Sequence, residues 1–172
     1  THGFDIGDEV ILNPGLNCRC CEFCMRGQQS ECTNYGIVGL SRQGTFAEKL
    51  AVPFYNLRRK PKYLSFNEAA GIPLTHLTSW RMLYTRGNLK PGKILLIHGI
   101  GGGVALAALK LAKLSSVEVI VTSSSDEKLQ KALQMGADHG LNYKKVDDIA
   151  KAVLEMTEGR GVDLIALSMI SH

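Results

Sequence analysis

Long apolar runs, basic clusters and dispersed cysteines are all absent from this sequence of 172 residues. No apolar stretch reaches the roughly 18 residues that a membrane-spanning helix needs, so no membrane segment is expected. The 20 Lys and Arg and the 16 Asp and Glu are spread without a basic block, which makes nucleic acid an unexpected partner. The first residues lack the basic and then apolar pattern of a secretory signal.

All five cysteines lie between positions 18 and 32. Cys18, Cys21 and Cys24 are each separated by two residues, and Cys32 follows after seven more. This spacing allows four thiolates to converge at about 2.3 Å on one Zn²⁺ in a closed tetrahedral site. Because a closed site leaves no position for water or substrate, we interpret the zinc as structural.

The fifth cysteine, Cys20, stands outside this set and offers an alternative register with Cys24. Two other interpretations remain open: a disulfide or free buried thiols, and a zinc-ribbon module for nucleic acid. Ribbons usually pair two separate C-x₂-C knuckles, whereas three cysteines share one run here. An odd number of cysteines in one tight cluster favours a metal and a reducing cytoplasm.

The expected secondary structure changes along the chain. Residues 1–60 read as short strands and loops, with the zinc lobe at 14–36 and candidate strands at 8–12 and 44–52. Residues 61–89 read as connecting helices that begin at a capping box and are interrupted by Pro73. The second helix is expected from Thr75 or His76 to Arg86. The apolar residues Leu77, Trp80, Leu83 and Tyr84 are expected on one face of the second helix.

Residues 90–172 alternate between strands and helices. The expected strands are 94–97, 117–122, 141–143 and 162–167, and the expected helices are 104–114, 124–136 and 147–158. The second of these helices is expected to begin with a capping box of Ser124 and Glu127. Alternation at this spacing predicts an α/β fold with a parallel sheet and right-handed crossovers.

A glycine loop joins the first of these strands to its helix. Read as G-x-x-G-x-x-A, it places Gly99, Gly102 and Ala105, with Gly101 and Gly103 beside them. Glycines let a phosphate lie against bare backbone at a helix N-terminus, and the strand–helix context is the one that this motif requires. A flexible turn in an unrelated α/β protein is the alternative interpretation.

The end of the second strand carries Thr122-Ser123-Ser124-Ser125 where an acidic residue would bind the ribose of NAD. Without that acid, a 2′-phosphate meets no repulsion and the serine hydroxyls can donate to it. Ser123, Ser124 and the nearby Lys128 therefore favour NADP over NAD. The alternative is that the serines only form a capped loop.

Taken in order, these motifs resemble the zinc-containing medium-chain alcohol dehydrogenases from about residue 4 to about residue 167. The resemblance rests on the cysteine spacing, the glycine loop and five further segments: Asn13–Leu16, Gly44–Glu48, Ala69–Leu74, Thr78–Trp80 and Met135–Asp138.

The resemblance implies a GroES-like catalytic domain followed by a Rossmann domain, with a catalytic zinc that polarises the oxygen during hydride transfer to or from NAD or NADP. The small-molecule substrate would be an alcohol, aldehyde or ketone. Thr78 would lie by the nicotinamide, the loop from Gly99 to Val104 would cradle the pyrophosphate, and Ser123 would select the cofactor. Such enzymes are commonly homo-oligomers.

The sequence departs from the family at its ends. The first catalytic zinc ligands would lie before Thr1, and Leu74 stands where a further ligand is expected, with His76 nearby as a possible substitute. The last Rossmann strands would follow His172. We therefore expect an incomplete fragment without turnover of its own. The alternatives are a module that only binds zinc and dinucleotide, and a relative of NADPH quinone reductases with an added zinc lobe.

Overall fold

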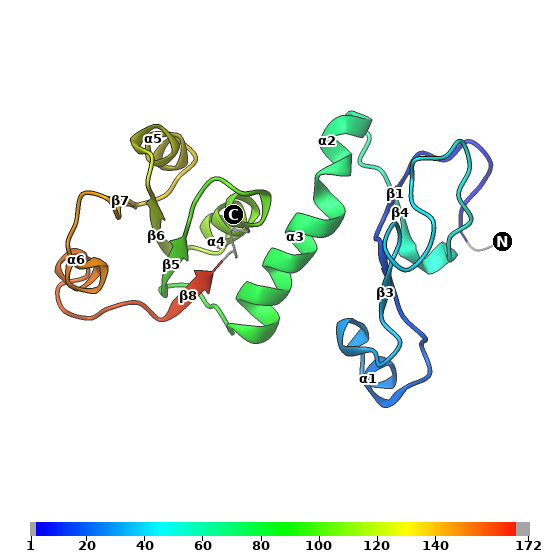
Figure 1. The fold of residues 1–172 in the computed structure, drawn as a ribbon, viewed down its shortest axis with the longest axis horizontal. Coiled ribbons are helices and arrows are strands. Elements are labelled where there is room, and N and C mark those ends of the chain that lie inside the picture. The colour runs from blue at the N-terminus through cyan, green and yellow to red at the C-terminus, as the bar shows by residue number, and fades with distance from the viewer. Residues whose placement is uncertain (1–2, 168–172) are drawn as a thin grey trace. The chain divides into compact units, whose positions relative to one another are not determined.

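The computed structural model describes residues 3–167 and divides the chain into two compact units, Thr1–Leu74 and Thr75–His172 (Figure 1). Among the helices that the structure describes, none is both long and apolar enough to cross a membrane.

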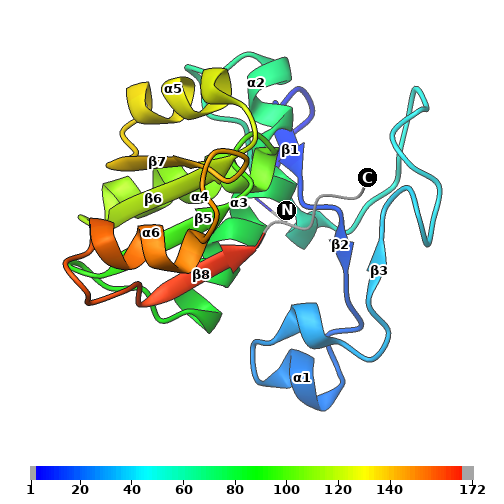
Figure 2. The same cartoon turned by 60° about the vertical axis from the view of Figure 1, so that its left-hand side comes forward.

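The first unit is built from short antiparallel pairs and loops. Strand β1 pairs with β4, and β2 pairs with β3. These strands and the unit's helical segments are β1 Val10–Leu12, β2 Gly15–Leu16, α1 Glu22–Met25, η1 Gln29–Glu31, β3 Gly36–Ile37, η2 Phe54–Asn56, β4 Leu57–Arg59 and α2 Phe66–Ala70. The cysteine lobe is the segment that connects β2 to β3 (Figure 2).

A buried asparagine ties the entrance of this lobe to the chain before β4. The Asn56 amide donates to the carbonyl oxygens of Asn13 and Gly15, at 2.6 Å each, and Asn13 N donates back to Asn56 O at 2.8 Å. These bonds satisfy backbone groups that an irregular segment would otherwise leave unpaired.

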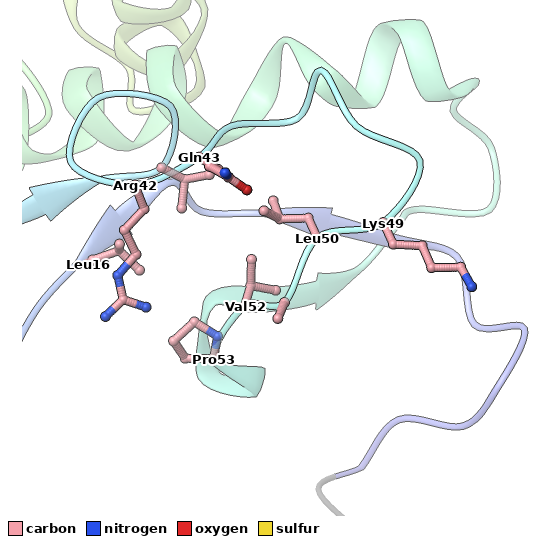
Figure 3. Close-up of a pocket in the computed structure, with 9 residues that line it drawn as sticks. Leu16, Arg42, Gln43, Lys49, Leu50, Val52 and Pro53 are labelled. Atoms are coloured by element: carbon pink, nitrogen blue, oxygen red, sulfur yellow. The ribbon is translucent and has the colours of Figure 1, made fainter.

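The strand expected at residues 44–52 does not form, and this prediction was wrong. The segment is irregular, and Phe46 is fully exposed. A strand needs a hydrogen-bonded neighbour, and the four strands described in this unit pair with one another. The second part of the segment instead lines a hollow of about 290 Å³, with Arg42 and Lys49 among its lining side chains (Figure 3).

The second unit contains the predicted parallel sheet, with strand order β7-β6-β5-β8. Helices α4 and α5 contribute to one apolar cluster and α6 to another, and both clusters include strand residues. Its strands and these helices are β5 Ile94–His98, α4 Gly103–Leu114, β6 Glu118–Ser123, α5 Asp126–Gln134, β7 His139–Asn142, α6 Ile149–Met156 and β8 Leu164–Leu167. The central strands are apolar and buried, as expected for strands covered on both faces. The α/β class is therefore confirmed.

The helices before the sheet are interrupted at a different residue from the one predicted. The capping box at Ser65 forms as predicted, but the interruption falls at Gly71. Helix α3, Ile72–Trp80, has Pro73 in its first turn, where a missing N–H costs no helical hydrogen bond. A π-helical segment, η3 Arg81–Arg86, follows directly.

The residues expected on one face of this helix are only partly buried. Leu83 is completely buried, whereas Leu77 and Trp80 are more than half exposed. The wider turn that begins after Trp80 rotates the later residues relative to the earlier ones, so 3.6-residue spacing does not carry across it.

The cap of α5 is shifted by one residue. Ser125, and not Ser124, accepts from the N–H of Lys128 at 3.3 Å, so the expected box of Ser124 and Glu127 was wrong. Ser124 is exposed. The shift makes Asp126 the first residue of the helix.

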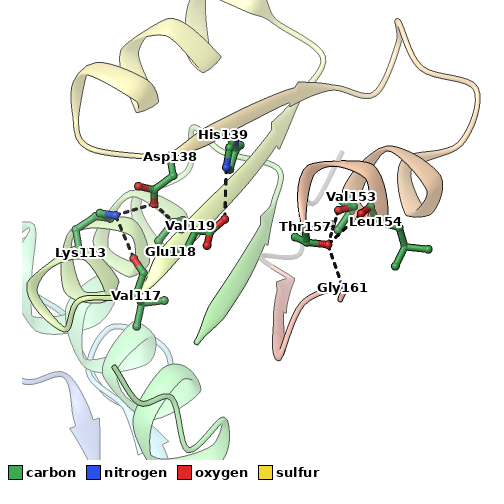
Figure 4. A network of polar contacts seen from close by, with 10 residues as sticks. All are labelled: Lys113, Val117, Glu118, Val119, Asp138, His139, Val153, Leu154, Thr157 and Gly161. Carbon is green, nitrogen blue, oxygen red and sulfur yellow. Dashed lines mark hydrogen bonds and ion pairs between the residues drawn. The ribbon is translucent and has the colours of Figure 1, made fainter. Parts of the chain in front are cut away.

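An aspartate just before each outer strand bonds that strand to its neighbour. Asp138 donates its N–H to Val119 O at 2.9 Å, and its carboxylate accepts from Val119 N at 2.7 Å and from Lys113 at 2.6 Å (Figure 4). Asp163 makes the same exchange with Ile94, at 2.9 and 2.8 Å. Both aspartates therefore extend the sheet's hydrogen bonds by a side chain.

Asp163 also pairs with Lys93 and Arg160, each at 2.8 Å. The hydrogen bond from Lys93, then that from Ile94 N–H, lowers the pKa of Asp163 to about 2. Because this pKa is below the value of about 3.9 for an unfolded aspartate, ionised Asp163 stabilises the fold above about pH 4. That contribution is lost as the pH falls through about 2.

We therefore expect Asp163→Asn to lower the stability of the second unit at neutral pH, by an amount that shrinks between about pH 4 and pH 2. Urea unfolding followed by the fluorescence of Trp80, the single tryptophan, measures this. Asp147→Asn, at an exposed position of the same unit, controls for the loss of one charge. A difference that stays constant over this pH range would contradict the assignment.

Candidate metal centre and dinucleotide-binding loop

Four of the five cysteine side chains converge in the lobe. The Sγ atoms of Cys18, Cys21, Cys24 and Cys32 all lie within 4.8 Å of one another, and Cys32 Sγ lies 3.5 Å from Cys18 Sγ. Cys20 is exposed and is not part of this group. All five cysteines are free, so the lobe contains four convergent sulfurs and no cross-link.

Backbone N–H groups point at these sulfurs. Cys18 N and Asn34 N both donate to Cys32 Sγ at 3.3 Å, and Cys21 N donates to Cys18 Sγ at 3.4 Å. Such donors stabilise a thiolate more than a thiol. The two-residue spacing accounts for the bond from Cys21 N to Cys18 Sγ, whereas the bond from Cys18 N to Cys32 Sγ joins residues 14 apart in the chain.

Two of these thiols, Cys18 and Cys24, differ in their pKa. Hydrogen bonds from the backbone of Cys20 and then Cys21 lower the pKa of Cys18 to about 6, whereas burial raises the pKa of Cys24 to about 12. A bound cation reverses the cost of burying a thiolate, because coordination deprotonates the thiol. The donor set thus fits a soft cation such as Zn²⁺, bound by four sulfurs.

The glycine loop runs from the end of β5 to the start of α4. Gly99 and Gly101 have φ angles of 80° and 138°, which side-chain-bearing residues rarely adopt. The loop is held against β6, because Gly99 N donates to Thr122 Oγ1 at 3.1 Å and Ile100 N donates to Thr122 O at 2.7 Å. Gly102 is the N-cap of α4.

Gly102 and Gly103 differ in what surrounds them. A Cβ added at Gly102 would meet nothing within 4 Å, whereas one at Gly103 would lie 2.9 Å from the Thr75 methyl group. The space beside Gly102 is therefore open to a ligand at the start of α4, and the space beside Gly103 is used for packing.

Helix α3 is held against the start of α4 by a buried hydroxyl. Ser79 Oγ lies 2.8 Å from the carbonyl oxygens of both Thr75 and Val104, so its single O–H hydrogen is shared between these two acceptors. Thr78, the adjacent residue, is exposed. The residue expected at the nicotinamide therefore belongs to a helix that is bonded to the end of the glycine loop.

The serines occupy the end of β6. Ser123 is its last residue, is buried, and accepts from Ser125 N at 3.1 Å. A hydroxyl that accepts in this way can still donate its own hydrogen. The Lys128 side chain lies beside Gly101, because a Cβ at Gly101 would lie 3.1 Å from Lys128 Cδ and 3.5 Å from its Nζ. Lys128 thus brings a positive charge to the loop.

Two features at this edge were given no role in the analysis of the sequence. His98 ends β5, with Nδ1 3.0 Å from Thr122 Oγ1, and its ring stacks at 5.8 Å on Tyr143, which follows β7. Asp126 is bonded to Asn142 and Lys145. Their positions at or just after the ends of parallel strands were the available signal, because such positions share one edge of the sheet.

His76 is not part of a group of potential metal ligands in the described residues. Its Nδ1 is 3.1 Å from Thr75 Oγ1, and Leu74 is exposed. Within residues 3–167, the four cysteines are the only group of three or more potential ligands whose ligand atoms come together.

Two family models match this chain. The alcohol dehydrogenase GroES-like domain matches residues 1–62, and the zinc-binding dehydrogenase domain matches residues 103–170. A zinc-type alcohol dehydrogenase-like protein from Schizosaccharomyces pombe is 37% identical over 94% of this chain and 45% of its own length. An NAD-dependent alcohol dehydrogenase from Saccharolobus solfataricus is 31% identical over 95% of this chain and 47% of its own.

Solved structures agree with these matches. The crystal structure of an NAD-dependent alcohol dehydrogenase superimposes with a TM-score of 0.90 at 45% identity, over 95% of this chain and 47% of that one. The chain thus spans about half the length of each of these three relatives. The convergent cysteines, the glycine loop and both family matches together show that the chain belongs to the zinc-type alcohol dehydrogenases of the medium-chain dehydrogenase superfamily.

Proposed function

We propose that this chain carries the structural zinc lobe and the dinucleotide-binding part of an NAD(P)-dependent oxidoreductase. The whole protein would transfer hydride between a small alcohol and the corresponding aldehyde or ketone. The observation that carries the proposal is the open space at Gly102, at the N-terminus of α4, beside a loop held in a glycine-specific conformation.

The dinucleotide would be held at the edge where the glycine loop and the end of β6 meet. The N–H groups and dipole at the start of α4 attract a pyrophosphate, and Lys128 adds a positive charge. When bound, the nicotinamide accepts or donates the hydride. The residues proposed to contact the dinucleotide are Thr78, Gly99, Gly101, Gly102, Gly103, Val104, Ser123, Ser124 and Lys128.

The zinc proposed at Cys18, Cys21, Cys24 and Cys32 is structural. Four sulfurs fill its tetrahedral coordination and leave no position for a substrate. No catalytic zinc is assigned within residues 3–167, and His76 is not proposed as a ligand, because two further ligands do not accompany it there.

The remaining parts of the proposal concern organisation. Residues 1–60 would form part of the catalytic domain, with the lobe at 14–36, residues 61–89 the connection, and residues 90–172 part of the Rossmann domain. The whole protein would act in the cytoplasm as a homo-oligomer.

We further propose that the site prefers NADP(H), because Ser123 stands where an acid would accept from the NAD ribose. Calorimetric titration of the zinc-loaded chain with NADPH and NADH tests both proposals. Ser123→Asp is expected to reverse the preference, since the new carboxylate repels a 2′-phosphate and accepts from a 2′-hydroxyl. Tighter binding of NADH by the unmodified chain would refute the preference, and binding of neither would refute the dinucleotide site.

A further inference from the structure

We propose that Lys145 is a specificity-determining residue, which holds the Asp126 carboxylate in a neutral ion pair so that the cofactor edge accepts a 2′-phosphate. This inference rests on the dinucleotide site proposed above and concerns two residues that lie outside the proposed contact set. Lys145 acts here through Asp126 and is not proposed to contact the cofactor.

The pair lies beside the end of β6. Parallel pairing sets Ser123 opposite Asn142, so the ends of β6 and β7 are neighbours. Asp126 follows Ser123 by three residues, as the first residue of α5. Both of its carboxylate oxygens are occupied, because Oδ1 accepts from Asn142 Nδ2 at 2.7 Å and Oδ2 accepts from Lys145 Nζ at 2.6 Å.

Asp126 would otherwise favour the wrong dinucleotide. Hydrogen bonds from Lys145 and then Asn142 lower its pKa, so the group is ionised at neutral pH and its charge must be balanced. An unpaired carboxylate in this turn would repel a 2′-phosphate and could accept from the 2′-hydroxyl of NAD. Lys145 removes both effects, because its ammonium group supplies the opposite charge and occupies an acceptor oxygen.

A second ion pair in the same turn provides a matched control. Glu127, the next residue of α5, pairs with Lys131 one turn further along the same helix, at 2.7 Å. In both pairs the side chains are more than half exposed. Exposed pairs contribute little to stability, so removal of either lysine should leave the fold intact. Only the first pair involves the loop after β7.

The experiment measures dissociation constants for NADPH and NADH on the zinc-loaded chain, by calorimetry, for the unmodified protein and four variants. Lys145→Ala is expected to raise the ratio of the NADPH to the NADH constant by about tenfold, because one unbalanced charge is exposed at the ribose edge. Asp126→Asn should leave the ratio equal or lower. The double variant Lys145→Ala/Asp126→Asn should restore the original ratio, and Lys131→Ala should change it less than about twofold.

Three outcomes would overturn the inference. An equal effect of Lys131→Ala would mean that net charge alone sets the preference. A double variant that stays as weak for NADPH as Lys145→Ala would mean that Lys145 itself contacts the phosphate. An unchanged ratio in Lys145→Ala would remove the pair from cofactor selection. If the unmodified chain bound neither dinucleotide, the dinucleotide site itself would fail, which is distinguishable from all three. Equal circular dichroism spectra verify that the variants compared are folded.

Discussion

Replacing Cys24 with serine is expected to abolish stoichiometric zinc binding and to unfold the cysteine lobe. A structural zinc contributes about 10–16 kcal/mol of binding free energy in small metal-dependent domains, and much of it appears as folding free energy. The lobe has no apolar core to replace it: among residues 14–36, the buried side chains are those of Cys24 and Cys32 themselves. Metal analysis and limited proteolysis of the purified variant measure the two effects.

Cys20→Ser is the matched control, because it removes an exposed thiol from between two of the converging cysteines. It should retain one zinc per chain and the protease resistance of the unmodified protein. Equal zinc loss in the Cys20 and Cys24 variants would show that the ligand set is wrong and that the register through Cys20 is used.

The second large effect is expected at Gly102 and Gly103, where valine should weaken cofactor binding at the first position and lower stability at the second. Gly102→Val should weaken NAD(P)H binding by more than about a hundredfold, because its side chain would fill the space where the pyrophosphate approaches. The unfolding temperature should hardly change, since that space is open in the protein and φ at Gly102 is −81°. Calorimetric titration and thermal unfolding of one preparation separate the two quantities.

Gly103→Val should instead lower the unfolding temperature, because its Cβ would lie 2.9 Å from the Thr75 methyl group. Any loss of binding in this variant should accompany loss of structure. If Gly102→Val bound NAD(P)H as tightly as the unmodified chain, the glycine loop would not be the pyrophosphate site.

Several features of this protein could be predicted from the sequence because they depend on residues close together in the chain. Cysteine spacing predicts which sulfurs can meet, because a two-residue turn constrains its own backbone. The alternation of apolar strands and helices predicts a parallel sheet through the handedness of its crossovers. The capping box at Ser65 formed as predicted, since its partners are three residues apart and need no distant neighbour.

The wrong predictions share a cause, which is competition with neighbours. Residues 44–52 have the pattern of a strand but pair with no other strand described in their unit. Leu77 and Trp80 match the helical repeat but precede a π-helical segment that shifts its phase. Ser124 and Ser125 are equally good caps by residue type, and the end of β6 decides between them, because Ser123 Oγ accepts from Ser125 N.

The local sequence thus indicates where the metal lobe and the glycine loop lie and which residues form them, because both depend largely on bonds within a few residues. The tertiary structure decides how those residues are used. It leaves Gly102 open while Thr75 packs against Gly103, and it brings Asn142 and Lys145 to Asp126 across 16 and 19 residues of chain. The contacts of Asp126 arise only when β6 and β7 align their ends at one edge of the sheet, so spacing along the chain does not encode them.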